Sequence, residues 1–188
     1  MKLVLGSKSP RRREILSMVT GDFSVRVSDC DESYEKGTPL CDVPRILAER
    51  KAMAINAQAD EVIIGCDTVV VYDRELMGKP CDKADAVRML KRLSGTTHLV
   101  ISGICVRTVD KSYSEAVTTY VTFRDISDSE INAYVEKYNP VDKAGAYGIQ
   151  EAAGAFVKQI SGDFYNVVGL PLCRLCEILK DEFKIEIL

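Results

Sequence analysis

The segment that decides the fold class is KLVLGSKSPRRR, residues 2–13. Its apolar start, Lys2–Leu5, predicts a short buried strand. Ser9 is a favourable residue for capping a helix and Pro10 fits the first helical position, so we expect a helix from there to about Val19. A strand that leads through a loop of small residues into a helix is typical of the first unit of an α/β fold.

The rest of the chain interleaves helix and strand patterns. We expect helices from a cap at Asp42, and at residues 83–93, 128–138 and 171–182. The apolar stripe expected on the first of these consists of Val43, Ile46, Leu47, Met53, Ala54 and Ala57. Strands are expected at residues 23–28, 61–72 (interrupted at 65–68), 98–109, 113–123, 155–160 and 184–187. The polar Asp110–Ser112 predicts an antiparallel hairpin, so the fold class expected is α/β with a mixed β-sheet flanked by helices.

Length and composition limit the kind of protein. The 188 residues, 46% hydrophobic and 28% charged, predict a single folded domain over residues 1–188. The net charge of -3 argues against a duplex-binding protein, and no apolar run approaches a membrane span, so we expect a cytoplasmic protein with no nucleic-acid or membrane partner. Seven cysteines, an odd number, do not indicate a disulfide framework, and we interpret Cys173 and Cys176 as small apolar helix residues.

The loop at residues 6–13 has the features of a phosphate site. Backbone N–H groups at a helix start favour an anion. Lys8 and Arg11–Arg13 place positive charge at the positive end of that helix, which costs stability unless an anion binds or the side chains extend into water. Arginine binds phosphate in a bidentate manner, although the loop lacks the Walker A pattern. The alternative is a solvated basic helix start.

Two carboxylate positions could hold a metal ion or carry chemistry. Asp29, Asp31 and Glu32 are clustered after an expected strand, and clustered carboxylates suit Mg²⁺ or Mn²⁺. Asp67 interrupts an apolar run, where a buried charge needs a partner, so it is a candidate catalytic group. The alternatives are an acidic turn for the first position and a turn-capping residue for the second.

Weaker signals lie elsewhere in the chain. Lys79 stands in the rigid turn Gly78–Pro80, and the segment Asp142–Gln150 contains two closely spaced glycines of the kind that let backbone approach a ligand. A plain turn is the alternative for each. We interpret the single histidine, His98, as structural, since one histidine cannot form a His-rich zinc site and no G-x-S-x-G motif is present.

Taken together, these segments resemble the Maf family of nucleotide pyrophosphatases nearly from end to end. Residues 5–12 (LGSKSPRR) look like the family's LASxSPRR signature with Gly6 in place of alanine. Residues 65–70 (GCDTVV) look like GADTVV with Cys66 in place of alanine. The other matching motifs are Asp31-Glu32, residues 48–52 (AERKA), 78–80 (GKP), 142–150 (DKAGAYGIQ), Gly162-Asp163 and 166–171 (NVVGLP). Several motifs in the right order are more specific than any one alone.

This resemblance implies an elongated α/β fold shared with inosine triphosphate pyrophosphatases, a homodimer and a divalent metal cofactor. Asp67 matches the family's proton acceptor, and Arg11, Thr68 and Gln150 match positions linked to substrate choice. A branch that acts on 7-methyl-GTP typically carries Trp in place of Arg11 and Gln in place of Thr68. The residues present here are similar to the branch that hydrolyses dTTP and UTP to the monophosphate and diphosphate.

The resulting hypothesis gives each candidate residue a role. Ser7, Arg11, Arg12, Lys51 and Lys79 bind phosphates. Glu32 with Asp67 holds Mg²⁺ or Mn²⁺, and Asp67 orients or deprotonates the attacking water. Gln150 offers both a donor and an acceptor to uracil or thymine.

Three rival interpretations stay open at this stage. One is a non-catalytic nucleotide sensor that regulates cell division, which would not need Asp67. Another is a nucleic-acid-binding module that uses the Arg11–Arg13 patch, against which the net acidity argues. The third is an enzyme of the same class acting on modified or purine triphosphates.

Overall fold

A computed structural model describes residues 1–27 and 29–187 of the chain. Its strands are β1 (Lys2–Gly6), β2 (Phe23–Val25), β3 (Glu61–Tyr72), β4 (Glu75–Met77), β5 (Thr97–Arg107), β6 (Ser112–Phe123) and β7 (Val157–Ser161). Its α-helices are α1 (Pro10–Ser17), α2 (Val43–Met53), α3 (Lys83–Leu93), α4 (Asp128–Tyr138), α5 (Phe164–Val168) and α6 (Leu172–Phe183). Three short 3₁₀ helices, η1 (Pro140–Asp142), η2 (Ala144–Ala146) and η3 (Ala152–Phe156), complete the described part.

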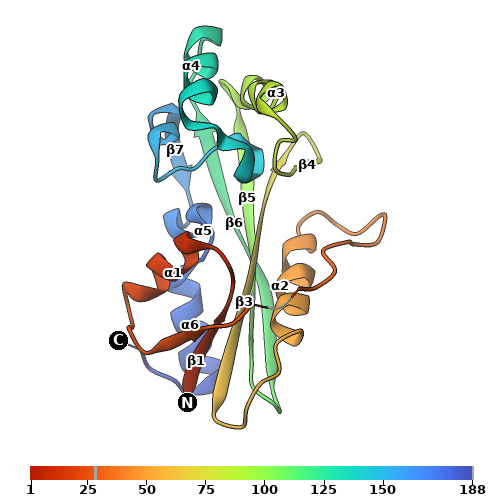
Figure 1. Cartoon of the computed structure of the whole chain (residues 1–188), viewed down its shortest axis with the longest axis vertical. Coiled ribbons are helices and arrows are strands. Elements are labelled where there is room, and N and C mark those ends of the chain that lie inside the picture. Colours follow the sequence, from red (N-terminus) through yellow and green to blue (C-terminus); the bar gives the residue numbers. More distant parts are fainter. Residues whose placement is uncertain (28, 188) are drawn as a thin grey trace. The chain divides into compact units, whose positions relative to one another are not determined.

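The strands form a mixed sheet, as the sequence predicts. Within the described residues the sheet has 7 strands in the order β2-β1-β3-β5-β6-β7, with β4 paired to β3 (Figure 1). Strand β1 is parallel to both β2 and β3, whereas the β3–β4 and β6–β7 pairs are antiparallel. The predicted hairpin is confirmed, because β5 and β6 are neighbours with Thr97 bonded to Thr122 at one end and Cys105 to Ser112 at the other.

The chain divides into two compact units. The first contains Met1–Thr68, Ser102–Val117 and Tyr165–Leu188, and the second contains Val69–Ile101 and Thr118–Phe164. That residues 1–188 act as one domain stays a prediction. No helix in the described part of the chain is long and apolar enough to span a membrane.

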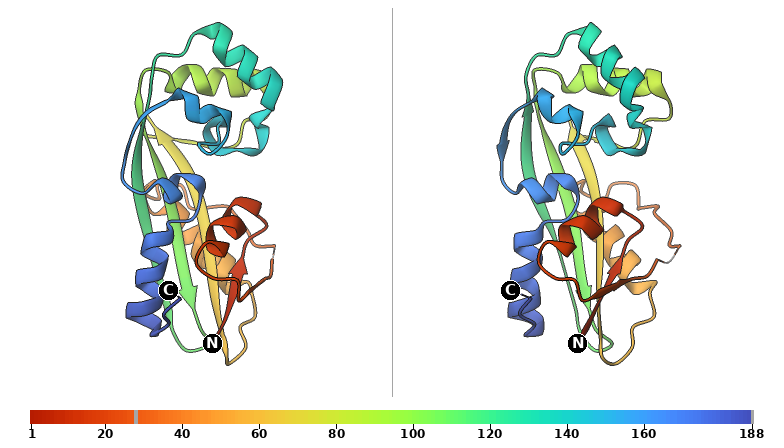
Figure 2. Two further views of the ribbon diagram at one scale, coloured as in Figure 1. Left: turned by 90° about the vertical axis from the view of Figure 1, so that its left-hand side faces the viewer. Right: turned by 60° about the vertical axis from the view of Figure 1, so that its left-hand side comes forward.

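In the first unit, helices cover both faces of the strands (Figure 2). Alternate side chains of a strand point to opposite faces. Leu3, Leu5 and Ile64 therefore pack with α1 and α6 on one face, whereas Val4 and Ile63 pack with α2 on the other. The two faces of β3 thus meet different helices, which decides what each of its polar residues contacts.

Helix α2 lies unusually close to the sheet because two strand positions carry no side chain. A Cβ atom on Gly65 would lie 2.3 Å from the backbone oxygen of Ala48, and one on Gly103 would lie 2.0 Å from that of Pro44. Such distances are below any real contact, so only glycine allows this packing. The close approach brings Lys51, on the last turns of α2, to Asp67 on β3.

In the second unit, α3 and α4 lie side by side (Figure 1). Both begin with a side-chain cap: Asp82 accepts from the Asp85 N–H, and Ser127 forms a capping box with Glu130. The predicted bounds of both helices are confirmed. His98, Phe123, Tyr147 and Phe156 form a cluster of edge-on ring contacts in the same unit.

Several sequence predictions need correction. Strand β3 runs through residues 65–68 without interruption, because neighbouring strands and a lysine partner satisfy that stretch. Residues 184–187 form no strand, since Lys184 takes a left-handed conformation and the Ile185 N–H bonds back to the Leu179 oxygen, which turns the chain over the end of α6.

The ends and faces of other elements also differ from the predictions. Met53 and Ala54, expected in the apolar stripe of α2, are exposed, because the helix ends there. Strand β2 ends at Val25, and the predicted strand residue Ser28 lies outside the described residues. Ser9 occupies the N-cap position of α1, but its side chain makes no capping bond.

Candidate active site

The loop between β1 and α1 is organised by the buried hydroxyl of Ser7. Its Oγ accepts a hydrogen bond of 3.2 Å from the Ser9 N–H and another of 3.2 Å from Arg12 Nη1. The Ser7 hydroxyl therefore fixes the loop just before the helix and does not replace the capping bond that was predicted for Ser9. The N–H groups of the first turn of α1 make no bond to a side chain of the N-cap residue, which is the arrangement an anion site requires.

Arg12 is tied into the protein by three hydrogen bonds. Besides Ser7, it donates from Nε to the Gly169 oxygen at 2.8 Å and from Nη2 to Thr68 Oγ1 at 3.1 Å. A guanidinium has five N–H donors, so these bonds leave two for a phosphate. Gly169 has φ +129°, a conformation that favours glycine, and this turn aims its carbonyl at Arg12. The structure thus joins three predicted site residues, Ser7, Arg12 and Thr68, in one network.

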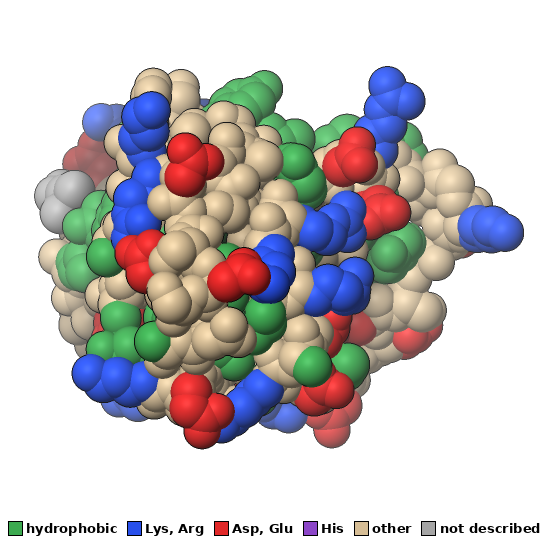
Figure 3. All heavy atoms as spheres, turned by 90° about the horizontal axis from the view of Figure 1, so that it is seen from above, with side chains coloured by type: hydrophobic (Ala, Val, Ile, Leu, Met, Phe, Trp, Pro, Cys, Tyr) green, Lys and Arg blue, Asp and Glu red, His purple; other side chains and the backbone are tan. Residues whose placement is uncertain are grey.

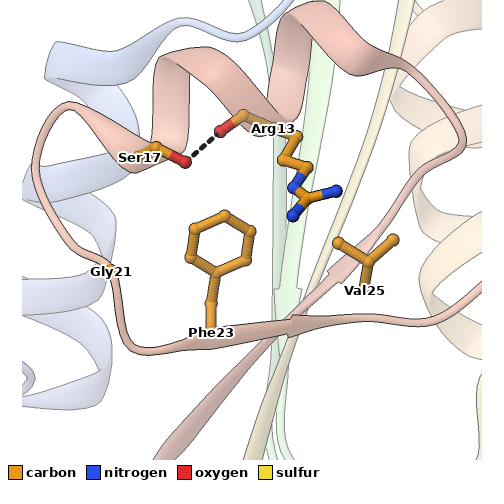
Figure 4. Close-up of a pocket in the computed structure, with 5 residues that line it drawn as sticks. All are labelled: Arg13, Ser17, Gly21, Phe23 and Val25. Carbon is orange, nitrogen blue, oxygen red and sulfur yellow. Dashed lines mark hydrogen bonds between the residues drawn. The ribbon is translucent and has the colours of Figure 1, made fainter.

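The other basic residues of this loop diverge. Lys8 pairs with Asp29 at 3.2 Å on the surface, and Arg11 is partly buried. Arg13 lines a hollow of about 270 Å³ between α1 and β2 with Ser17, Gly21, Phe23 and Val25 (Figure 4). That hollow contains none of the predicted site residues, so we assign no chemistry to it.

Lys51 bridges the two carboxylates that the sequence singled out. Its Nζ lies 2.5 Å from Asp67 Oδ1 and 2.9 Å from Glu32 Oε1. Burial opposes a charge on this lysine, but Asp67 and Glu32 outweigh it and raise the pKa of Lys51 above its ordinary value. The ammonium therefore stays charged at neutral pH, and the structure answers the predicted need of Asp67 for a partner.

The same two carboxylates were predicted to hold a metal. Among the described residues no group of three His, Cys, Asp or Glu side chains could enclose one. Both carboxylates nevertheless converge on a single cation, the ammonium of Lys51. Mg²⁺ commonly binds through one or two carboxylates together with substrate phosphates, so this donor set fits a cation that arrives with a nucleotide.

Asp67 and Thr68 are consecutive on β3 and contact opposite helical layers. Asp67 meets α2 through Lys51, whereas Thr68 meets α1 through Arg12. Burial raises the pKa of Cys66, and the charges of Arg12, Asp67 and Lys51 all act on its thiol. Both groups therefore lie close to Cys66. Strand β1 ends opposite Gly65, so this point lies just past the carboxyl end of a parallel strand, where α/β proteins bind ligands.

Two predicted site residues lie in the second unit, both exposed: Lys79 and Gln150. Their segments are joined, since the Gly145 N–H donates to the Gly78 oxygen at 3.0 Å. Lys143 holds the second segment together, with Nζ 2.9 Å from Asp142 and 3.3 Å from Glu151.

His98 is a buried core residue, as interpreted from the sequence. It is 1% exposed, and its Nε2 lies 2.8 Å from the Tyr147 hydroxyl. Burial lowers the pKa of His98 to about 4, so the ring is neutral at pH 7. Cys173 and Cys176 lie on α6 as free cysteines, with Cys176 packed against the core and Cys173 exposed.

Sequence reasoning missed several residues of the network around Thr68. Ser102 Oγ and the Gly169 oxygen lie within hydrogen-bonding distance of the Thr68 hydroxyl, and the Asn166 oxygen accepts from Ser102. Along the chain, Ser102, Asn166 and Gly169 stand 34, 98 and 101 positions from Thr68. The only signal was a serine within the apolar run of β5 and the glycine of the NVVGLP motif. Neither indicates a partner without the sheet order.

Comparison with known proteins identifies the family. The family described as Maf-like protein matches residues 2–182. The chain belongs to the Maf family. A protein of Clostridium novyi named dTTP/UTP pyrophosphatase is 45% identical over 96% of this chain and 97% of its own length. Proteins of the same name from Bacillus velezensis and Bacillus anthracis are 43% and 41% identical over 98% and 99% of this chain, and 98% and 97% of their own lengths.

Solved structures give a more distant likeness. A nucleoside-triphosphatase / dITP/XTP pyrophosphatase from Mycobacterium abscessus shares 15% identity with this Maf protein, covering 67% of this chain and 76% of that one with a TM-score of 0.45. The α/β fold class rests on the sheet and helices described above rather than on this likeness.

Proposed function

We propose that this Maf protein hydrolyses dTTP and UTP to the nucleoside monophosphate and diphosphate. The observation that carries the proposal is the bridge from Lys51 to Asp67 and Glu32, beside a helix start whose loop holds Arg12. This arrangement combines cations for a triphosphate with a carboxylate that can handle a water molecule. The names of relatives more than 40% identical over nearly the whole chain support the substrate class.

In this proposal the phosphates bind at the start of α1. The backbone N–H groups there, Ser7, Arg11 and the two remaining N–H donors of Arg12 contact the phosphate oxygens. Lys51 adds a charge that its raised pKa maintains at neutral pH. That Lys79, which lies in the second unit, also binds a phosphate stays a prediction from the sequence. Positive charge fixed in advance around the phosphates stabilises the charge that develops as the anhydride bond breaks.

Asp67 orients or deprotonates the water that attacks the α-phosphorus, and pyrophosphate leaves. Its side chain is only 13% exposed and forms an ion pair with the ammonium of Lys51. Glu32 and Asp67 are the residues that would hold Mg²⁺ or Mn²⁺. When bound, such a cation supplies additional neutralisation of the phosphate oxygens.

Substrate choice is assigned to Arg11, Thr68 and Gln150. The amide of Gln150 is exposed and can both donate and accept, as the pairing edge of uracil or thymine requires. The homodimer stays a prediction from the family resemblance, and the cytoplasmic location stays a prediction from the sequence.

The test is to measure pyrophosphate release from dTTP, UTP, CTP, dATP and GTP with Mg²⁺ or Mn²⁺. We expect the highest kcat/KM for dTTP and UTP, with pyrophosphate and monophosphate as the products. Release of inorganic phosphate and a diphosphate nucleoside would place the cut at the wrong bond. Tight binding of dTTP with no release from any triphosphate would contradict the proposal and favour a nucleotide sensor.

A further inference from the structure

Thr68 belongs to a chain of polar atoms that runs from the site into the core. Arg12 Nη2 donates to Thr68 Oγ1 at 3.1 Å, Thr68 Oγ1 lies 2.8 Å from Ser102 Oγ, and Ser102 Oγ lies 3.1 Å from the backbone oxygen of Asn166. Ser102 is 0% exposed, so water cannot substitute for its partners. All of these residues belong to the first unit.

The direction of each bond follows from counting protons. A carbonyl oxygen can only accept, so Ser102 donates its one proton to Asn166 and must accept at its own oxygen. The short contact to Thr68 is then a bond in which Thr68 donates. Thr68 has one hydroxyl proton, which is therefore directed into the core.

The other acceptor near Thr68 does not change this result. The Gly169 oxygen lies 3.3 Å from Thr68 Oγ1, but it already accepts from Arg12 Nε at 2.8 Å and from Cys66 Sγ at 3.2 Å. A carbonyl oxygen has two lone pairs, and these two donors fill them. Ser102, at 2.8 Å, is the better acceptor for the Thr68 proton.

We propose that Ser102, through its bond to the Asn166 carbonyl, fixes Thr68 as a hydrogen-bond acceptor towards the nucleotide, and that the matching donor is the N3–H group of uracil and thymine. This inference rests on the proposed function, in which Thr68 contacts the substrate. Phosphate oxygens are acceptors and would be repelled by an oxygen of this polarity. Cytosine carries an acceptor at N3 and is disfavoured for the same reason. Ser102 touches no substrate and acts as a positioning residue.

The test is the ratio of kcat/KM for UTP to that for CTP in Ser102→Ala. Removing Ser102 frees the Thr68 proton to turn towards the ligand, so Thr68 can donate to the N3 of cytosine. One neutral hydrogen bond corresponds to about a 3- to 10-fold change, and we expect the ratio to fall by that amount. An unchanged ratio in a folded Ser102→Ala protein overturns the inference.

Two further variants separate polarity from general damage. Thr68→Val removes the hydroxyl, should also lower the ratio, and should abolish any further effect of Ser102→Ala. Thr119→Val removes another hydroxyl that is 0% exposed and bonded elsewhere, to Asp163, and should leave the ratio unchanged. A ratio that falls equally in Thr119→Val overturns the assignment to Ser102. If Ser102→Ala does not fold, Thr68→Val with an unchanged ratio still overturns it.

The substrate panel identifies the donor, and binding separates the two proposals. The kcat/KM for UTP methylated at N3 should be lower than that for UTP, by a larger factor in the wild type than in Ser102→Ala. The kcat/KM for 3′-deoxy-dTTP should equal that for dTTP in both proteins. A dependence on the 3′-hydroxyl alone would assign the donor to the sugar and overturn the N3–H claim. The same ratios are measured as dissociation constants. Absence of turnover overturns the proposed function, and the affinity ratios still decide the inference.

Discussion

The two faces of β3 at residues 67 and 68 each carry a polar side chain, and the two side chains are bonded in different ways. Asp67 meets one charged partner at the end of a long side chain, the ammonium of Lys51, which also contacts the exposed Glu32. Thr68 meets a planar guanidinium, a buried hydroxyl and a carbonyl whose bonds fix one another. The first group can exchange one cation for another, whereas the second is organised before any ligand arrives.

This difference separates chemistry from recognition. A lysine on a flexible stem can move from a carboxylate to a phosphate oxygen, and the carboxylates it leaves can take a metal. A buried network of satisfied hydrogen bonds resists rearrangement, because any partner left unpaired costs its full desolvation penalty. Changes on the Asp67 side should therefore affect turnover, and changes on the Thr68 side should affect stability and selectivity.

The largest effect is expected for Asp67→Asn. The amide cannot accept a proton from water, so kcat should fall by ~10²- to 10⁴-fold while the protein stays folded. Steady-state pyrophosphate release measures this. Asp85→Asn is the matched control, because the Asp85 side chain is 14% exposed, compared with 13% for Asp67, and is also paired with a basic residue. A comparable loss of turnover in the control would assign the effect to general damage.

The next effect concerns a buried base whose pKa moves in the opposite direction to that of Lys51. Burial lowers the pKa of His98 from 6.5 to about 4. Between pH 6.5 and 4, His98 therefore binds a proton in the unfolded chain but stays neutral in the folded protein. The stability from neutral His98 is complete above pH 6.5 and is lost as the pH falls to 4, by up to about 3 kcal/mol.

Urea unfolding at several pH values between 7 and 4 measures this loss. The wild type should lose more stability over that interval than His98→Phe, in which the titrating group is absent. Equal pH dependence in the two proteins would show that His98 is not buried in its neutral form.

A smaller effect is expected for Arg12→Lys, which tests the rigid side of the comparison. A lysine cannot reach Ser7, Thr68 and the Gly169 oxygen together, so unfolding should become easier by about 1 to 2 kcal/mol. For a chain of this size the melting temperature should fall by about 2 to 8 °C. Arg13→Lys, at an exposed position on the same helix, should change it little. Equal melting temperatures for the two variants would contradict a structural role for Arg12.

Much of the fold could be predicted from local patterns. Helices α3 and α4 have their predicted bounds because caps and apolar periodicity agree there. The predicted interruption of β3 was wrong. A charged residue such as Asp67 within an apolar run indicates a loop unless its ion-pair partner is known. That partner, Lys51, reaches Asp67 only because Gly65 lets α2 approach the strand. The turn at Lys184 likewise depends on a left-handed backbone conformation that no local sequence pattern predicted.

The residues of the candidate site could be proposed from sequence motifs, but the hydrogen bonds and ion pairs between them could not. The motifs predicted Arg12, Lys51, Asp67 and Thr68 as site residues, and the structure joins them into two groups. Ser102 could not be found, because a serine in a buried strand has no distinctive pattern and its meaning depends on which strand lies beside β3.

Surface charge agrees with the net acidity. Lys and Arg side chains are interspersed with Asp and Glu on the face shown in Figure 3, with no continuous basic area there.

The most direct test of a division between chemistry and recognition uses one preparation of Asp67→Asn. The dissociation constant for dTTP and the rate of a single turnover are measured together in the presence of a divalent cation. Binding close to that of the wild type, with a turnover rate lower by ~10²-fold or more, is the predicted result. Near-normal turnover in a folded Asp67→Asn protein would contradict the role of Asp67 and with it the proposed mechanism.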